Sequence, residues 1–215
     1  PDPERDGDGD GDEDEDGGED READAPADDP KPALEVLGRD CGASDLEPHE
    51  GFQDAPRCVD TAFGEVADEE RNPSLLITSA PQSVAAGEAF EIEVSTRNLV
   101  RDRFLGAKDG GYYLESSFLT PEGIQRGHFH TACRMLPSTD VAPDAAPEPV
   151  FFVATQDGGG GARPDSVTVP VPEGLPGAGT AQCAVWAGDG SHRIPMMQRA
   201  NQVPAFDIIR IEVAG

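Results

Sequence analysis

From Ser74 to the end of the chain, the sequence consists of short apolar runs separated by glycine and proline. Phe90, Ile92 and Val94 alternate with polar residues, a period-two pattern that predicts a strand with one buried face. Including this strand, we expect about eight, the others at 75–78, 112–119, 127–135, 150–155, 166–171, 180–186 and 206–213. Residues 85–88 are typical of a turn, and the four glycines at 158–161 predict a mobile loop.

No long 3.6-residue apolar period separates these runs, which argues against parallel βαβ units. Many short strands with regularly spaced turns are typical of two packed antiparallel sheets. We therefore predict an all-β fold over residues 73–215, an antiparallel two-sheet β-sandwich of the immunoglobulin or fibronectin-III type.

The charge is concentrated at the N-terminal end. The chain carries a net charge of −27, and residues 1–30 contain 16 acidic and 2 basic residues. Residues 1–33 have almost nothing to bury, so we predict a disordered acidic leader. Its Asp-Gly repeats lack the pattern of an EF-hand, and we do not expect calcium binding there. Such a charge disfavours nucleic acid and favours cations or basic partners.

The four cysteines are Cys41, Cys58, Cys133 and Cys183, and none forms a C-x-x-C pair. An even number without metal-type spacing favours disulfides. Three connectivities are open, of which locality favours Cys41 with Cys58 and Cys133 with Cys183. The first pair would staple residues 34–72 into a flap that covers one edge or end of the main domain.

Disulfides indicate an extracytoplasmic location, either secreted or at the cell surface. No run of about 18 apolar residues is present, so we expect no transmembrane segment. Because the first residue is Pro1 rather than methionine, we expect a processed product.

Two of the four histidines, His128 and His130, lie two residues apart in a predicted strand. Strand periodicity places both imidazoles on one face, opposite Phe129 and Cys133, so that they face solvent or the flap. If Cys133 pairs with Cys183, His192 reaches the same end of the domain. Three neutral imidazoles of this kind are ligands for copper or zinc.

A second interpretation of the same histidines stays open, namely ordinary hydrogen-bonded residues. Arg126 and Arg134 flank the pair and would make a cationic patch that discourages a metal. No G-x-S-x-G motif is present, and no Ser/His/Asp trio is indicated by spacing. The sequence therefore predicts no catalytic residues and favours a protein that is not an enzyme.

Several arginines lie in the predicted inter-strand loops and beside the histidines. They either pin these loops through carboxylates or form a polar recognition surface for an extracellular protein or a glycan. The candidates are Arg101, Arg103, Arg126, Arg134, Arg193 and Arg199.

Residues 74–215 resemble a family of small secreted β-rich proteins, known mainly from filamentous fungi and also from bacteria. The resemblance rests on the stretches NLVRDRF, GGYY, RGHFHTACRML and CAVWAGDGSHRIPMMQRANQ. It implies secretion and a shared core disulfide, and it transfers no catalytic role. The acidic leader and the flap lie outside it.

Taken together, the sequence favours a non-enzymatic, secreted or cell-surface domain that acts in extracellular binding or assembly. One alternative is a copper or zinc protein, or a metalloenzyme, built on His128, His130 and His192. Another is a homo-oligomeric subunit of an extracellular filament, in which an exposed sheet edge accepts a strand from a neighbour.

Overall fold

The structure, a computed structural model, describes residues 36–215, of which 38–215 form one compact unit. The predicted leader at 1–33 lies outside the described residues. As predicted, the fold is all-β. The described helices are three-residue 3₁₀ turns, η1 (Cys41–Ala43), η2 (Glu69–Arg71) and η3 (Ala107–Asp109). None of them has the length or apolarity to cross a membrane.

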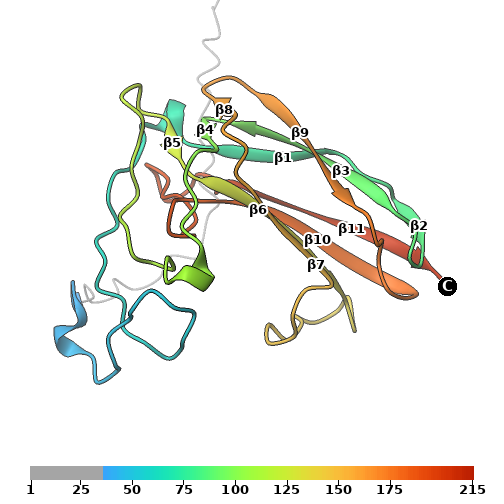
Figure 1. The fold of residues 1–215 in the computed structure, drawn as a ribbon, viewed down its shortest axis with the longest axis horizontal. Helices are drawn as coiled ribbons and strands as arrows, with labels where there is room; N and C mark the ends of the chain where they lie inside the picture. The colour runs from blue at the N-terminus through green and yellow to red at the C-terminus, as the bar shows by residue number, and fades with distance from the viewer. Residues whose placement is uncertain (1–35) are drawn as a thin grey trace, which may run out of the picture. The chain divides into compact units, whose positions relative to one another are not determined.

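Eleven strands form three sheets in the described part of the chain (Figure 1). The largest sheet contains, in spatial order, β2 (Ser83–Ala85), β11 (Phe206–Ala214), β10 (Gly179–Gly188), β6 (His128–Met135) and β7 (Phe151–Thr155). The second contains β1 (Ser74–Ser79), β3 (Phe90–Arg97) and β9 (Asp165–Val171). A small third sheet contains β5 (Gln125–Arg126), β4 (Leu99–Val100) and β8 (Gly160–Gly161).

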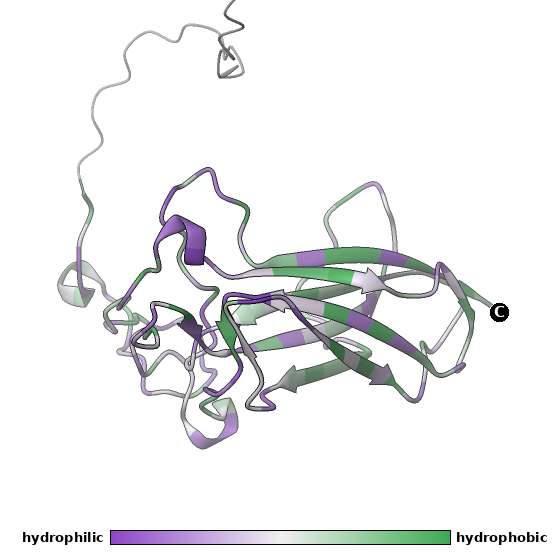
Figure 2. Ribbon diagram, turned by 90° about the horizontal axis from the view of Figure 1, so that it is seen from above, coloured by the Kyte–Doolittle hydropathy of each residue, from purple (hydrophilic) through white to green (hydrophobic). Residues whose placement is uncertain are grey.

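The two larger sheets contribute to a single hydrophobic core. Ile92 and Val94 of β3 are fully buried, as their alternation predicts, and they belong to the same cluster as Val185 and Ile211 of the five-stranded sheet. The alternation of hydrophobic and hydrophilic residues along the strands is visible in Figure 2. Apolar burial across these two layers supplies most of the driving force for folding.

Pairing is not purely antiparallel, because β2 runs parallel to β11 and β5 runs parallel to β4. The glycine run at 158–161, which we expect to form a mobile loop, instead contributes β8 and pairs with β4. Gly160 has a φ of 84°, and a Cβ there would lie 2.1 Å from the Leu99 carbonyl oxygen. Glycine therefore permits this close backbone approach.

The strand predicted at 112–119 is absent. This segment follows two glycines and contains turns and single bridges, and Tyr113 has a φ of 56°. Its backbone groups bond to the segment predicted as the flap: Tyr112 N–H donates to the Gly51 carbonyl, and Ser117 N–H donates to the Phe63 carbonyl. The polar backbone is thus satisfied between two irregular segments rather than in a sheet.

Both disulfides form the pairs that locality favours. Cys41 bonds to Cys58, and Cys133 bonds to Cys183. Cys133 and Cys183 are directly opposed on the neighbouring strands β6 and β10 and are buried. This bond therefore links two strands of one sheet, whereas the disulfide of antibody domains links two sheets.

We expect the two disulfides to differ in their contribution to stability. The sequence separations of 50 and 17 residues correspond to about 4 and about 3 kcal/mol of loop-closure entropy. Removing the buried bond with Cys133→Ala and Cys183→Ala also leaves a cavity in the core. Urea unfolding should therefore show a larger loss of unfolding free energy in this double variant than in the Cys41→Ala and Cys58→Ala double variant. Equal losses would contradict the greater contribution of the Cys133–Cys183 bond.

Candidate metal centre

His128 and His130 lie on the face of β6 that points away from the Cys133 side chain. Against prediction, they do not face solvent, since their exposed fractions are 0% and 6%. The ring of Phe104 packs edge-on against His128, with centroids 4.9 Å apart. Phe104 therefore covers His128, and Gln53 of the predicted flap lines the cavity beside His130.

His192 follows β10 in a tight turn and brings a third imidazole to the same place. Its ring lies parallel to that of His130, with centroids 5.5 Å apart, and its centroid is 5.0 Å from that of His128. One nitrogen from each of the three rings lies within 4.8 Å of the others. The structure therefore brings together the three histidines that the sequence singled out.

The turn that presents His192 is held by a buried carboxylate. Asp189 accepts hydrogen bonds from the backbone N–H groups of Ser191 and Arg193, at 2.9 and 3.1 Å. His192 itself has a φ of 75°, a conformation that is strained for a residue with a Cβ. Local hydrogen bonds therefore maintain an unfavourable backbone angle that directs the ring toward β6.

Hydrogen bonds assign protons to two of the rings. His128 Nδ1 lies 3.0 Å from the Arg103 carbonyl oxygen, and His192 Nε2 lies 2.5 Å from the Leu105 carbonyl oxygen. A carbonyl can only accept, so these nitrogens carry the hydrogens and the other nitrogen of each ring keeps a lone pair. Histidine ligands of metals are commonly oriented by this kind of backbone contact.

The nitrogens of His128 and His130 meet directly. Their Nε2 atoms are 3.0 Å apart, and His130 Nδ1 is buried without a hydrogen-bond partner. Two atoms at this separation can both lie about 2.1 Å from a single ion. Ligands about 2.1 Å from one tetrahedral ion lie about 3.4 Å apart, so a separation of up to 4.8 Å means that the rings would have to approach by as much as about 1.4 Å.

Burial keeps these two rings neutral. It lowers the pKa of His128 to about 4, partly opposed by the hydrogen bond to Arg103. It lowers the pKa of His130 to about 3, with a further contribution from the neighbouring imidazoles. The neutral ring is the form that binds metal, so no proton has to be removed from either at pH 7.

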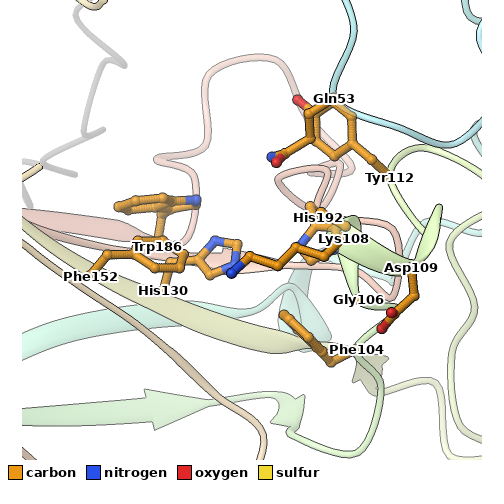
Figure 3. Close-up of a pocket in the computed structure, with 11 residues that line it drawn as sticks. Gln53, Phe104, Gly106, Lys108, Asp109, Tyr112, His130, Phe152, Trp186 and His192 are labelled. Carbon is orange, nitrogen blue, oxygen red and sulfur yellow. The ribbon is translucent and has the colours of Figure 1, made fainter. Parts of the chain in front are cut away.

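A cavity of about 500 Å³ opens onto His130 and His192 (Figure 3). Aromatic and polar side chains line it together. The aromatic residues are Phe104, Tyr112, Phe152 and Trp186, and the polar residues are Gln53, Lys108 and Asp109. The sequence analysis did not predict these cavity residues. If Cys133 and Cys183 are opposed on antiparallel strands, the residues three positions before Cys133 and three positions after Cys183 are also opposed, which places Trp186 opposite His130.

The six arginines considered for a recognition surface are engaged in bonds to the protein itself. Arg101 is only 2% exposed, so its assignment to a surface is wrong; it pairs with Asp157 and Asp165, both at 2.8 Å. The other partners are Glu115 for Arg103, Asp102 for Arg126, Gln182 for Arg134, Asp189 for Arg193 and Glu69 for Arg199. Carboxylates thus offset the charge of Arg103, Arg126 and Arg193 near the histidines.

No protein-family model and no curated protein matches the chain. Similar solved structures include a CARDB domain from Pyrococcus furiosus, described as a complex with di-metal ions. It has 10% sequence identity and a TM-score of 0.35, and the match covers 66% of this chain and 92% of that one. A β-glucosidase from Listeria innocua, in complex with glucose, has 13% identity and a TM-score of 0.34; 67% of this chain matches 16% of the enzyme. Likenesses this weak assign neither a family nor a function.

Arg101 is buried, whereas its partners Asp157 and Asp165 are partly exposed, so the expected mutational effect comes from the arginine itself. Arg101→Ala removes a buried side chain together with its hydrogen bonds, and it should destabilise the fold by about 2 kcal/mol. Arg199, whose side chain is 58% exposed beside Glu69, provides the control, and Arg199→Ala should change stability by less than about 1 kcal/mol. Urea unfolding measures both, and equal effects would contradict a structural role for Arg101.

The lowered pKa values predict how the metal-free protein responds to acid. An unfolded imidazole titrates near 6.5, so between about pH 6.5 and 4 the unfolded chain binds more protons than the folded one. The stabilisation from neutral His128 and His130 is complete above this range and is lost as the pH falls through it.

The thermal midpoint of the metal-free protein should therefore fall by several degrees between pH 7 and pH 4.5. His130→Gln should reduce this fall, whereas His49→Gln, which changes the histidine outside the cluster, should preserve it. Scanning calorimetry at each pH makes the comparison. An identical pH dependence in all three proteins would show that the buried rings do not titrate as described.

Proposed function

We propose that this protein binds a single copper or zinc ion through His128, His130 and His192. The observation that supports this most strongly is the convergence of three imidazoles, two of them with Nε2 atoms 3.0 Å apart. Three histidines leave a coordination position for a water or a ligand, as in open zinc sites. In this proposal that position faces the aromatic cavity.

The ligand type and the charge favour a transition metal. Imidazole suits copper and zinc, whereas calcium and magnesium prefer oxygen ligands. The acidic chain attracts cations, and the nearby arginines are paired. A hydrogen bond between two histidines with only a structural role would also explain the 3.0 Å contact between His128 and His130. It would not explain why His192 is held beside them in a strained backbone conformation.

We also propose that the protein acts outside the cytoplasm, which two disulfides support. Its two larger sheets would form a sandwich of the immunoglobulin or fibronectin-III type, with residues 34–72 as a flap. Extracellular binding, the function that the sequence favours, would use the cavity at the metal. The filament alternative stays a prediction that size-exclusion chromatography can test.

Fluorescence and electron paramagnetic resonance test the metal centre. Trp186 is the single tryptophan of the chain, and its ring centroid lies 5.0 Å from that of His130. Titration of the metal-free protein with Cu²⁺ at pH 7 should therefore quench its emission at one equivalent. The spectrum of the copper-loaded protein should show coupling to three nitrogens.

Variants identify the ligands. His192→Ala should weaken copper binding by at least about tenfold and remove one nitrogen coupling, because one of three ligands is lost. His49→Gln and Arg126→Ala should bind as the original protein does. Failure of Cu²⁺ and Zn²⁺ to bind, or equal binding by His192→Ala, would refute the proposed centre.

A further inference from the structure

We propose that the cavity at the histidines is one end of a groove that binds a neutral glycan chain, with a sugar hydroxyl directed to the metal. The groove follows from the shape and chemistry of the sheet surface. Only the contact between the hydroxyl and the metal rests on the proposed metal centre.

The cavity is lined by aromatic side chains, two of which are exposed to solvent. Trp186 comes from β10 and Phe152 from β7, and they stand across the cavity from Tyr112 (Figure 3). Phe152 is 54% exposed and Phe104 is 37% exposed. Large aromatic faces left open beside a cavity indicate a ligand with a flat apolar face.

A second hollow lies farther along the outer face of the five-stranded sheet. It has a volume of about 310 Å³, shares Trp186 with the first and reaches Ala184 and Gln182, the next residues of β10 on that face. Ala145, Pro147 and Pro149, from the loop before β7, also line it. Ala184 is directly opposite Ala132 of β6. Two small side chains between larger ones leave a trough that runs along the strands.

The ends of the trough are defined by larger groups. At one end Trp186 is opposite His130, and at the other Arg134 donates a hydrogen bond to Gln182 at 2.9 Å. Four residues of strand separate the ends, which corresponds to roughly 13 Å. The groove is therefore longer than a single sugar ring, and a linear ligand fits it better than a compact one.

The polar groups around the groove select a neutral polyhydroxylated ligand. Gln53, Lys108 and Asp109 at the first cavity, with Arg134 and Gln182 at the second, offer both donors and acceptors. A hydroxyl is both donor and acceptor, so it matches such a mixed set. A polyanion is disfavoured by Asp109 and by the net charge of −27.

A peptide fits this surface less well than a glycan. Peptides that add to sheets pair with the free backbone of an edge strand. Here the groove lies over β6 and β10 and runs along them. Both strands are paired on each side, so the groove offers a sheet face rather than an edge. A sugar chain needs no backbone pairing, since its rings stack on aromatic side chains and its hydroxyls bond to polar side chains.

The test uses an array of neutral and acidic glycans with the full chain, loaded with copper, followed by calorimetry on the glycans retained. Neutral chains of several sugars should be retained, and their binding should shift the emission of Trp186 in the zinc-loaded protein. Phe152→Ala should weaken binding by about tenfold, and Ala184→Leu, which fills the trough, should weaken it at least as much. Phe63→Ala, which removes another exposed aromatic ring, should have no effect.

The outcomes separate the groove from the metal centre. Retention of no neutral glycan, or only of acidic glycans or peptides, would overturn the inference, as would unchanged binding by Phe152→Ala and Ala184→Leu. Both variants should keep the copper affinity and thermal midpoint of the original protein, so that a loss of glycan binding is specific. Equal glycan affinity with and without metal would overturn the hydroxyl contact alone, whereas weaker affinity without metal would support it.

Discussion

The pairing of β6 with β10 determines most of what this protein presents at its surface. Cys133 and Cys183 are directly opposed and covalently linked, so the register of the two strands is fixed. A shift by one residue would turn every side chain of a strand to the other face. With both cysteines in the core, residues an odd number of positions away must lie on the outer face, and there His130 meets Trp186.

The same register explains two glycines that frame the site. Gly188 is directly opposite His128, and a Cβ at this position would lie 2.8 Å from His128 Nε2. A Cβ on Gly127 would lie 1.9 Å from the Gly188 carbonyl oxygen. Gly188 therefore makes room for the imidazole of His128, and Gly127 makes room for the backbone at the end of β10.

The sequence is sufficient for the seven longest strands and for the convergence of the histidines, because period-two alternation and one disulfide carry that information. It is insufficient for the burial of His128 and His130, which depends on how Phe104 and the irregular segment around Tyr112 fold over the sheet. That segment reads as a strand locally, yet its backbone bonds to Gly51 and Phe63 far away in the chain. In this segment, long-range hydrogen bonds outweigh the local propensity to form a strand.

The buried arginine illustrates the same limit in another part of the fold. Arg101 follows β4 in a polar stretch that resembles an exposed loop, and only the packing of β8 and β9 brings Asp157 and Asp165 to it. Its hydrogen bonds lower the pKa of both carboxyl groups. The sequence offered both roles for this residue, and the choice required knowledge of distant partners.

The arrangement of His128 and His130 is difficult to explain as a device for stability alone. Two apolar residues of similar size would pack there without leaving His130 Nδ1 buried and without a partner, which destabilises a fold by about 1–3 kcal/mol. The strained φ of His192 adds to this loss. Unfavourable features that cluster at one place, beside an open aromatic cavity, are expected where a fold has been shaped for binding. In the metal-free protein His130 Nε2 donates to the lone pair of His128 Nε2. A bound ion would take the place of this hydrogen between the two rings, and the polar rings would then be required rather than merely tolerated.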